Sequence, residues 1–225
     1  MNDQLMYDHV TNEIRKTVPR FKVVSKSKSM LMRVIGKIFF FNKEFMSSYF
    51  TTIYPNVYSP ETSLEKFRWT VLSHEWVHLL RAKQNVLAFS FRYLFPVSLA
   101  VFSVLSLLAI WGSSYWLLNL LWLVVAALPI PSYPRAYEER IAYRMSLAVE
   151  LWRYGNITQG SKDFIALQFT SGAYYYMWPF KKMVKRWVDK EEQDITSGKY
   201  NSMAPYSVMY DLIKQEKAGL LKPLE

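Results

Sequence analysis

Two histidines and a glutamate stand at a spacing that suits metal chemistry. Residues 72–80 read LSHEWVHLL, so His74, Glu75 and His78 form an HExxH motif inside an apolar, helical pattern. Residues four apart on a helix share a face, which lets two imidazoles take two corners of a zinc tetrahedron. The glutamate between them lies near enough to take a proton from a water activated by the metal. The motif therefore predicts a Zn²⁺ site with Glu75 as its general base.

The third metal ligand must come from elsewhere in the chain. The sequence has no cysteine, so this ligand is a histidine or a carboxylate. Residues 79–85 contain neither a histidine nor a glycine, which excludes the compact three-histidine motif. The remaining histidine, His9, lies far upstream and is interpreted as a surface residue. The acidic residues between His78 and Trp152 are Glu138, Glu139 and Glu150, and we expect the ligand among them, on a separate helix.

The elements around the motif are predicted to be mostly helices. Apolar periodicity with Pro, Gly and capping signals marks helical segments at 8–18, 60–84, 135–154, 162–178, 181–190 and 206–217. Residues 35–41 and 49–54 are β-branched and aromatic runs, which predict a small sheet before the HExxH helix. The Lys/Ser-rich stretch 23–33 is predicted to be a solvated or lipid-facing edge. The predicted fold class is mainly α (α+β).

A long uncharged stretch separates the motif from the acidic candidates. No charged side chain occurs from Tyr93 to Pro134, and Gly112 divides the stretch into apolar segments 93–111 and 115–130. The first segment is long enough to cross a bilayer and the second is slightly short. We therefore predict one domain over 1–225, interrupted at 93–131 by a transmembrane helical hairpin. The alternative is an apolar hairpin buried in a soluble core or in an oligomer interface.

The charge pattern indicates which partners to expect. A net charge of +10 favours an acidic partner. Basic residues flank the uncharged stretch on both sides, and the positive-inside rule then places this face in the cytoplasm, against anionic lipid. Two spans return the chain to the side it left, so His78 and Glu139 can meet there. The basic residues form no recognised nucleic-acid-binding motif, so nucleic acid is not an expected partner.

The two motifs together resemble those of the gluzincin group of zinc peptidases. In that group a second helix carries a glutamate ligand followed three residues later by a small residue, and Glu139 and Ala142 in PRAYEERIAYR match this form. The order of HExxH, apolar hairpin and glutamate is similar to that of HtpX-like membrane peptidases, although Tyr143 stands where those have an aspartate. The resemblance implies that Zn²⁺ is held by His74, His78 and Glu139.

The resemblance also implies a function and further site residues. It implies a gluzincin-like helical core and a metallopeptidase that cleaves a protein or peptide substrate at the membrane surface, with Glu75 as general base and acid. Glu138 is the second choice for the third ligand. Candidates by position for stabilising the oxyanion are Tyr143, Arg144 and the tyrosines at 174–176. The alternative function is a non-catalytic membrane or assembly scaffold descended from such a peptidase.

Overall fold

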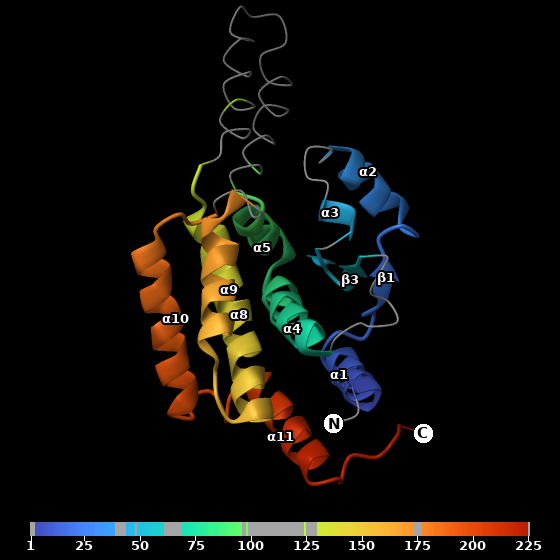
Figure 1. Cartoon of the computed structure of the whole chain (residues 1–225). Helices are drawn as coiled ribbons and strands as arrows, with labels where there is room; N and C mark the ends of the chain where they lie inside the picture. Colours follow the sequence, from blue (N-terminus) through green and yellow to red (C-terminus); the bar gives the residue numbers. More distant parts are fainter. Residues whose placement is uncertain are drawn as a thin grey trace, which may run out of the picture.

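A helical body with a small sheet on one side makes up the protein in its computed structural model (Figure 1). The structure describes residues 3–38, 44–47, 49–60, 69–95, 98, 124, 130–172 and 177–224. The helices are α1 (Asp3–Thr17), α2 (Met30–Ile38), α3 (Glu44–Ser47), α4 (Trp69–Gln84), α5 (Val86–Tyr93), α8 (Tyr133–Tyr154), α9 (Gln159–Thr170), α10 (Lys181–Thr196) and α11 (Tyr206–Lys217). The strands are β1 (Val23–Ser25), β2 (Thr51–Ile53) and β3 (Asn56–Ser59). The mainly α fold class is confirmed.

Helices α4 and α8 pack against each other at the centre of the body. Ser132 caps the start of α8 by accepting a hydrogen bond from the backbone N–H of Arg135, and Pro134 in the first turn has no N–H to leave unpaired. The helix ends at Gly155, whose φ of 82° is a left-handed conformation that favours glycine. The small Ala142 on the buried face lets α4 approach closely. This packing sets the HExxH motif opposite Glu138 and Glu139.

The other helices hold this central pair from both sides. Helix α1 packs against α4, while α10 and α11 pack against α8 (Figure 1). The indole N–H groups of two buried tryptophans fix α1 to α4, because Trp69 donates to Asp3 and Trp76 donates to Thr17. Both tryptophans belong to the hydrophobic core. The helix that carries the histidines therefore has little freedom to shift.

The sheet lies beside α4, with β3 between its two neighbours. Strand β1 runs parallel to β3 and pairs Val23 with Val57, whereas β2 runs antiparallel and pairs Thr52 with Val57. Strand β2 also contacts α4. The prediction of a strand within 49–54 is confirmed at Thr51–Ile53. The sheet thereby brings Thr52 to the HExxH helix.

The predicted strand at 35–41 is wrong where the structure describes it. Residues up to Ile38 belong to helix α2, which follows Ser29, whose hydroxyl accepts the backbone N–H of Met32. This capping contact, together with an apolar pattern of helical period, outweighs the strand preference of the β-branched residues. Residues 39–41 lie outside the described part of the chain.

Several helix boundaries also differ from those predicted. Helix α1 begins at Asp3, and α10 extends to Thr196. The predicted helix at 162–178 is shorter, because α9 ends at Thr170 and the backbone N–H of Trp178 returns to the carbonyl of Phe169. The start of the predicted helix at 60–84 falls largely on 61–68, outside the described residues.

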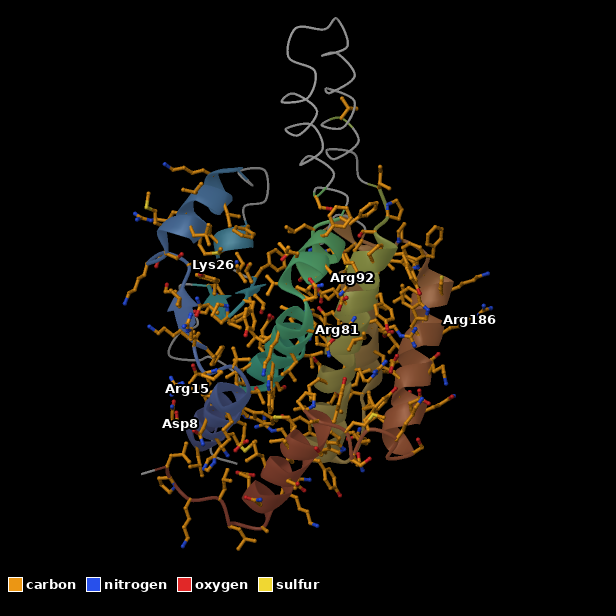
Figure 2. The ribbon with its side chains drawn as sticks, turned by 180° about the vertical axis from the view of Figure 1, so that it is seen from behind. Asp8, Arg15, Lys26, Arg81, Arg92 and Arg186 are labelled. Atoms are coloured by element: carbon orange, nitrogen blue, oxygen red, sulfur yellow. The ribbon has the colours of Figure 1, made fainter. Side chains whose placement is uncertain are left out.

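The Lys/Ser-rich stretch is mostly exposed or half-buried, as its composition predicts, except at Ser25, Lys26 and Met32. It forms β1 and the start of α2, and Lys26 within it is 0% exposed. The Lys26 ammonium donates to the carbonyl of Phe45 and lies 4.0 Å from the centre of that ring. Burial lowers the pKa of Lys26 to about 8, against a smaller upward effect of the Glu75 carboxylate. A charge from this stretch therefore faces the interior rather than lipid or solvent (Figure 2).

The predicted transmembrane hairpin is corrected. Within the described ranges no helix has the length and apolar character needed to cross a membrane, and most of 93–131 lies outside those ranges. Where the stretch is described, Tyr93 ends helix α5 and its hydroxyl donates to the buried Glu139. Arg81 and Arg92, which precede the uncharged stretch and are labelled in Figure 2, both pair with Glu138. These two charges therefore have a role inside the folded body.

Candidate metal centre

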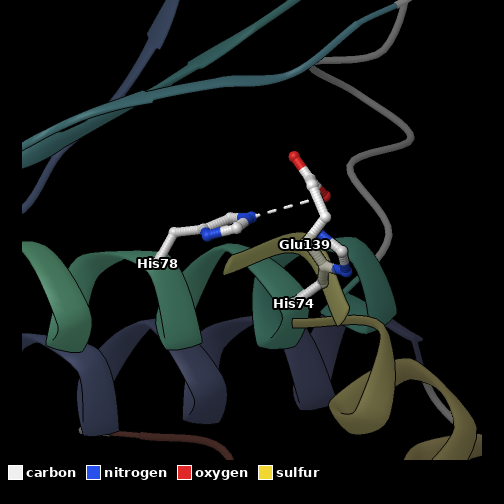
Figure 3. Close-up of side chains that lie close together, drawn as sticks. All are labelled: His74, His78 and Glu139. Carbon is white, nitrogen blue, oxygen red and sulfur yellow. Dashed lines mark ion pairs between the residues drawn. The ribbon is translucent and has the colours of Figure 1, made fainter. Parts of the chain in front are cut away.

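Three buried side chains converge between α4 and α8 (Figure 3). His74 and His78 project from α4, and Glu139 projects from α8. The Nε2 atoms of His74 and His78 lie 3.6 Å and 3.7 Å from Oε2 of Glu139. One ligand atom from each residue lies within 4.8 Å of the other two. The structure thus brings together the three residues expected to bind metal.

The two histidine–glutamate separations fit a metal better than direct hydrogen bonds. Both nitrogen–oxygen separations exceed the range of about 2.7–3.2 Å that is usual for an N–H···O hydrogen bond. They are close to the edge of about 3.3 Å in a tetrahedron whose metal–ligand bonds are about 2.0 Å. Two imidazole nitrogens and one carboxylate oxygen also form a donor set of catalytic zinc sites, which leave the fourth position to water or substrate. The residues present therefore fit Zn²⁺.

Each histidine is oriented by neighbours from other elements. Nδ1 of His74 lies 3.1 Å from the hydroxyl of Ser146 on α8, a contact that directs Nε2 towards the centre. The His78 ring packs against Phe89 and Tyr93 of α5, with ring centroids 5.9 Å and 5.3 Å away. Nδ1 of His78 is buried and has no hydrogen-bond partner among the described residues. Packing rather than a hydrogen bond therefore orients the second imidazole.

Glu75 is held by the sheet. It is almost fully buried beside the two histidines on α4, and the Thr52 hydroxyl of β2 donates to its Oε2. A hydrogen bond to one carboxylate oxygen fixes the plane of the carboxylate, which a general base needs in order to meet its proton at the right place. Strand β2 therefore belongs to the site as well as to the fold.

The two adjacent glutamates of α8 have different partners. Glu138 is 0% exposed and accepts hydrogen bonds from Nε and Nη2 of Arg81 at 2.9 Å and 3.0 Å and from Nε of Arg92 at 2.9 Å. Burial acts to raise the pKa of Glu138, but the two guanidiniums outweigh it and lower that pKa. Glu138 is therefore occupied by ion pairs, and Glu139 is the carboxylate that faces the histidines.

The charges of the cluster favour a cation. Burial acts to raise the pKa of Glu139, but the two imidazoles lower it well below its usual range. Burial opposes protonation of His78, yet the Glu139 carboxylate prevails and raises the pKa of this histidine. A buried carboxylate that stays ionised attracts positive charge, either as protons on the histidines or as a metal ion that replaces them.

Of the other predicted site residues, Tyr143 contacts the cluster, whereas the rest have other partners or lie outside the described chain. The Tyr143 ring contacts His74 with centroids 4.7 Å apart, whereas Arg144 donates to Glu191, 47 residues along the chain. Nε2 of His9 lies 2.7 Å from the carbonyl of Lys222 near the surface. Glu150 accepts hydrogen bonds from Thr158 and Ser161 at the start of α9, and the tyrosines at 174–176 lie outside the described residues.

Sequence reasoning missed three supporting residues: Thr52, Tyr93 and Ser146. Ser146 stands seven residues after Glu139, about two turns along α8, so helical spacing was a usable signal for it. Thr52 and Tyr93 are brought to the site by tertiary packing, and no local spacing marks them.

Comparison with known proteins returned no match, whether with family models, curated proteins or solved structures. The functional argument for this chain therefore comes from the residues of the site and their geometry.

Proposed function

We propose that this protein is a zinc-dependent metallopeptidase, with His74, His78 and Glu139 as the metal ligands. The observation that carries the proposal is the meeting of this ligand set, from two helices, beside the HExxH glutamate, Glu75. A structural zinc site would use four protein ligands, whereas three ligands and a carboxylate base suit catalysis. The substrate class, a protein or peptide, is proposed from the resemblance to gluzincins.

Each residue has a defined task in this proposal. When bound, zinc polarises the scissile carbonyl and acidifies a coordinated water. Glu75 takes the proton of the attacking water and passes it to the leaving amine. Thr52 holds the Glu75 carboxylate in place through its hydroxyl. Tyr143, whose ring lies against His74, is proposed as the group that stabilises the oxyanion.

Metal analysis of the purified protein tests the first half of the proposal. Wild type is expected to hold about one zinc per chain, the stoichiometry of a single three-ligand site. His74→Ala and Glu139→Ala should lose it. His9→Ala is the matched control, because His9 is the histidine outside the cluster, and this variant should keep the metal. A wild-type protein that stays metal-free after incubation with zinc sinks the proposal.

Hydrolysis of an unfolded protein such as casein tests the second half. Glu75→Gln keeps the size of the side chain and removes the base, so it should keep zinc while its cleavage rate falls by about 10²–10⁴-fold. Zinc without any cleavage in wild type would favour the alternative, a non-catalytic scaffold that has kept the metal. Cleavage that survives Glu75→Gln unchanged would contradict the role given to Glu75.

A further inference from the structure

Tyr93 touches two of the three proposed metal ligands. Its hydroxyl donates to Oε1 of Glu139, and its ring meets the His78 ring edge-on with centroids 5.3 Å apart. On its other sides the ring stacks on Phe89 at 5.5 Å, and the Arg135 guanidinium carbon lies 5.4 Å from its centre. These contacts restrict movement of the ring, so the hydroxyl is held against Glu139.

The placement of Tyr93 follows from the short connection between α4 and α5. Asn85 separates the two helices, and its side-chain oxygen accepts the backbone N–H of Ala88, which caps the start of α5. Helix α5 then packs against both α4 and α8, and Tyr93 is its last residue. Helix α5, which follows the HExxH helix, thus places the Tyr93 hydroxyl against Glu139 on α8.

The two carboxylate oxygens of Glu139 face different neighbours. Oε1 receives the Tyr93 hydroxyl, while Oε2 is the oxygen that lies 3.6 Å and 3.7 Å from the histidine nitrogens. A carboxylate that accepts a fixed donor on one oxygen has only the other oxygen free to bind an ion. Without the donor, both oxygens can turn towards the ion, and the coordination number rises from four to five.

We propose that Tyr93 is a positioning residue of the metal centre, which restricts Glu139 to binding the ion through one oxygen and so sets both the affinity and the coordination number. This inference rests on the proposed function, because it assumes that the cluster binds metal. Contacts that orient a metal ligand in this way are typically worth about 10- to 100-fold in metal affinity.

Cobalt binding to the purified full-length protein tests this inference. Co²⁺ reports its coordination number, since four-coordinate sites give much stronger visible absorption than five-coordinate sites. Tyr93→Phe keeps the ring and its packing but removes the donor. We expect this variant to bind Co²⁺ about 10- to 100-fold more weakly than wild type, with a weaker visible spectrum. Tyr137→Phe is the matched control, because this half-exposed tyrosine of α8 lies two residues before Glu139, and it should match wild type.

The outcomes separate this inference from the proposed function. No Co²⁺ or Zn²⁺ bound by wild type would overturn both. Tight binding by wild type, with an unchanged affinity and spectrum in Tyr93→Phe, would overturn only the role of Tyr93. Should Tyr93→Phe not fold, as judged by the thermal transition of the metal-free protein, the wild-type spectrum decides. A five-coordinate spectrum there overturns one-oxygen binding, and a four-coordinate spectrum supports it.

Discussion

The buried charge of Lys26 predicts an unusual response of stability to substitution and pH. Methionine has a similar length and no charge, so Lys26→Met removes the ammonium without leaving a large cavity. Each unit of pKa corresponds to about 1.4 kcal/mol. The fall in the pKa of Lys26 from 10.5 to about 8 therefore means that the charged form costs the folded state about 3 kcal/mol at neutral pH.

The sign of the effect follows from the direction of the pKa change. The folded pKa lies below the unfolded one, so between about pH 8 and pH 10.5 the unfolded chain binds more protons and the stability of wild type rises with pH. Below about pH 8 the full cost is present. Methionine also loses the hydrogen bond to the Phe45 carbonyl, worth about 1 kcal/mol. Lys26→Met should therefore be about 2 kcal/mol more stable than wild type near pH 7 and about equal to it near pH 9.5.

Urea unfolding of the metal-free protein at these two pH values measures the difference. The matched control is Lys28→Met, because Lys28 is exposed two residues farther along, and it should be nearly neutral at both pH values. The reasoning is refuted if Lys26→Met is clearly less stable than wild type near pH 7, or if the stability of both proteins changes with pH in the same way.

Two further substitutions test the supporting residues of the site. Thr52→Val removes the donor to Glu75 and keeps the β-branched shape, so cleavage should fall by about 10- to 100-fold with zinc content unchanged. Thr51→Val is the control, and a loss of zinc in Thr52→Val would contradict the role assigned to Thr52. Glu138→Gln leaves Arg81 and Arg92 without their charged partner, so the free energy of urea unfolding should fall by about 2–4 kcal/mol while zinc is retained. Glu139→Gln should lose zinc instead. Equal metal loss in both variants would contradict the different roles assigned to the two glutamates.

The HExxH part of the site was predictable because its geometry is local. Four residues of helix fix the separation of His74 and His78 whatever the rest of the chain does. The resemblance to gluzincins indicated Glu139 as the third ligand, and Glu138 remained the alternative. What separates the two glutamates is the position of Arg81 and Arg92, which pair with Glu138 across the packed helices. That information is tertiary, so local pattern could not supply it.

The errors in the predicted fold have a common cause. The composition of a segment indicates whether it favours water, but tertiary packing decides which of its side chains are buried. Lys26 stands in a polar stretch, yet it is buried and its ammonium contacts the carbonyl and the ring of Phe45 in α3. Tyr93 is the first residue of the uncharged stretch that was predicted to cross a membrane, yet its hydroxyl donates to the buried Glu139 carboxylate.

The clamp of Arg81 and Arg92 on Glu138 also bears on when the metal site forms. The clamp joins α8 to α4 and α5 through three hydrogen bonds and sets the rotation of α8 about its own axis. Since Glu139 follows directly, its direction is determined before any ion arrives. In zinc fingers the ion itself drives folding and a chelator unfolds the chain. Here the helices fold without the ion, so a chelator should remove the metal and leave the helices folded and able to bind metal again.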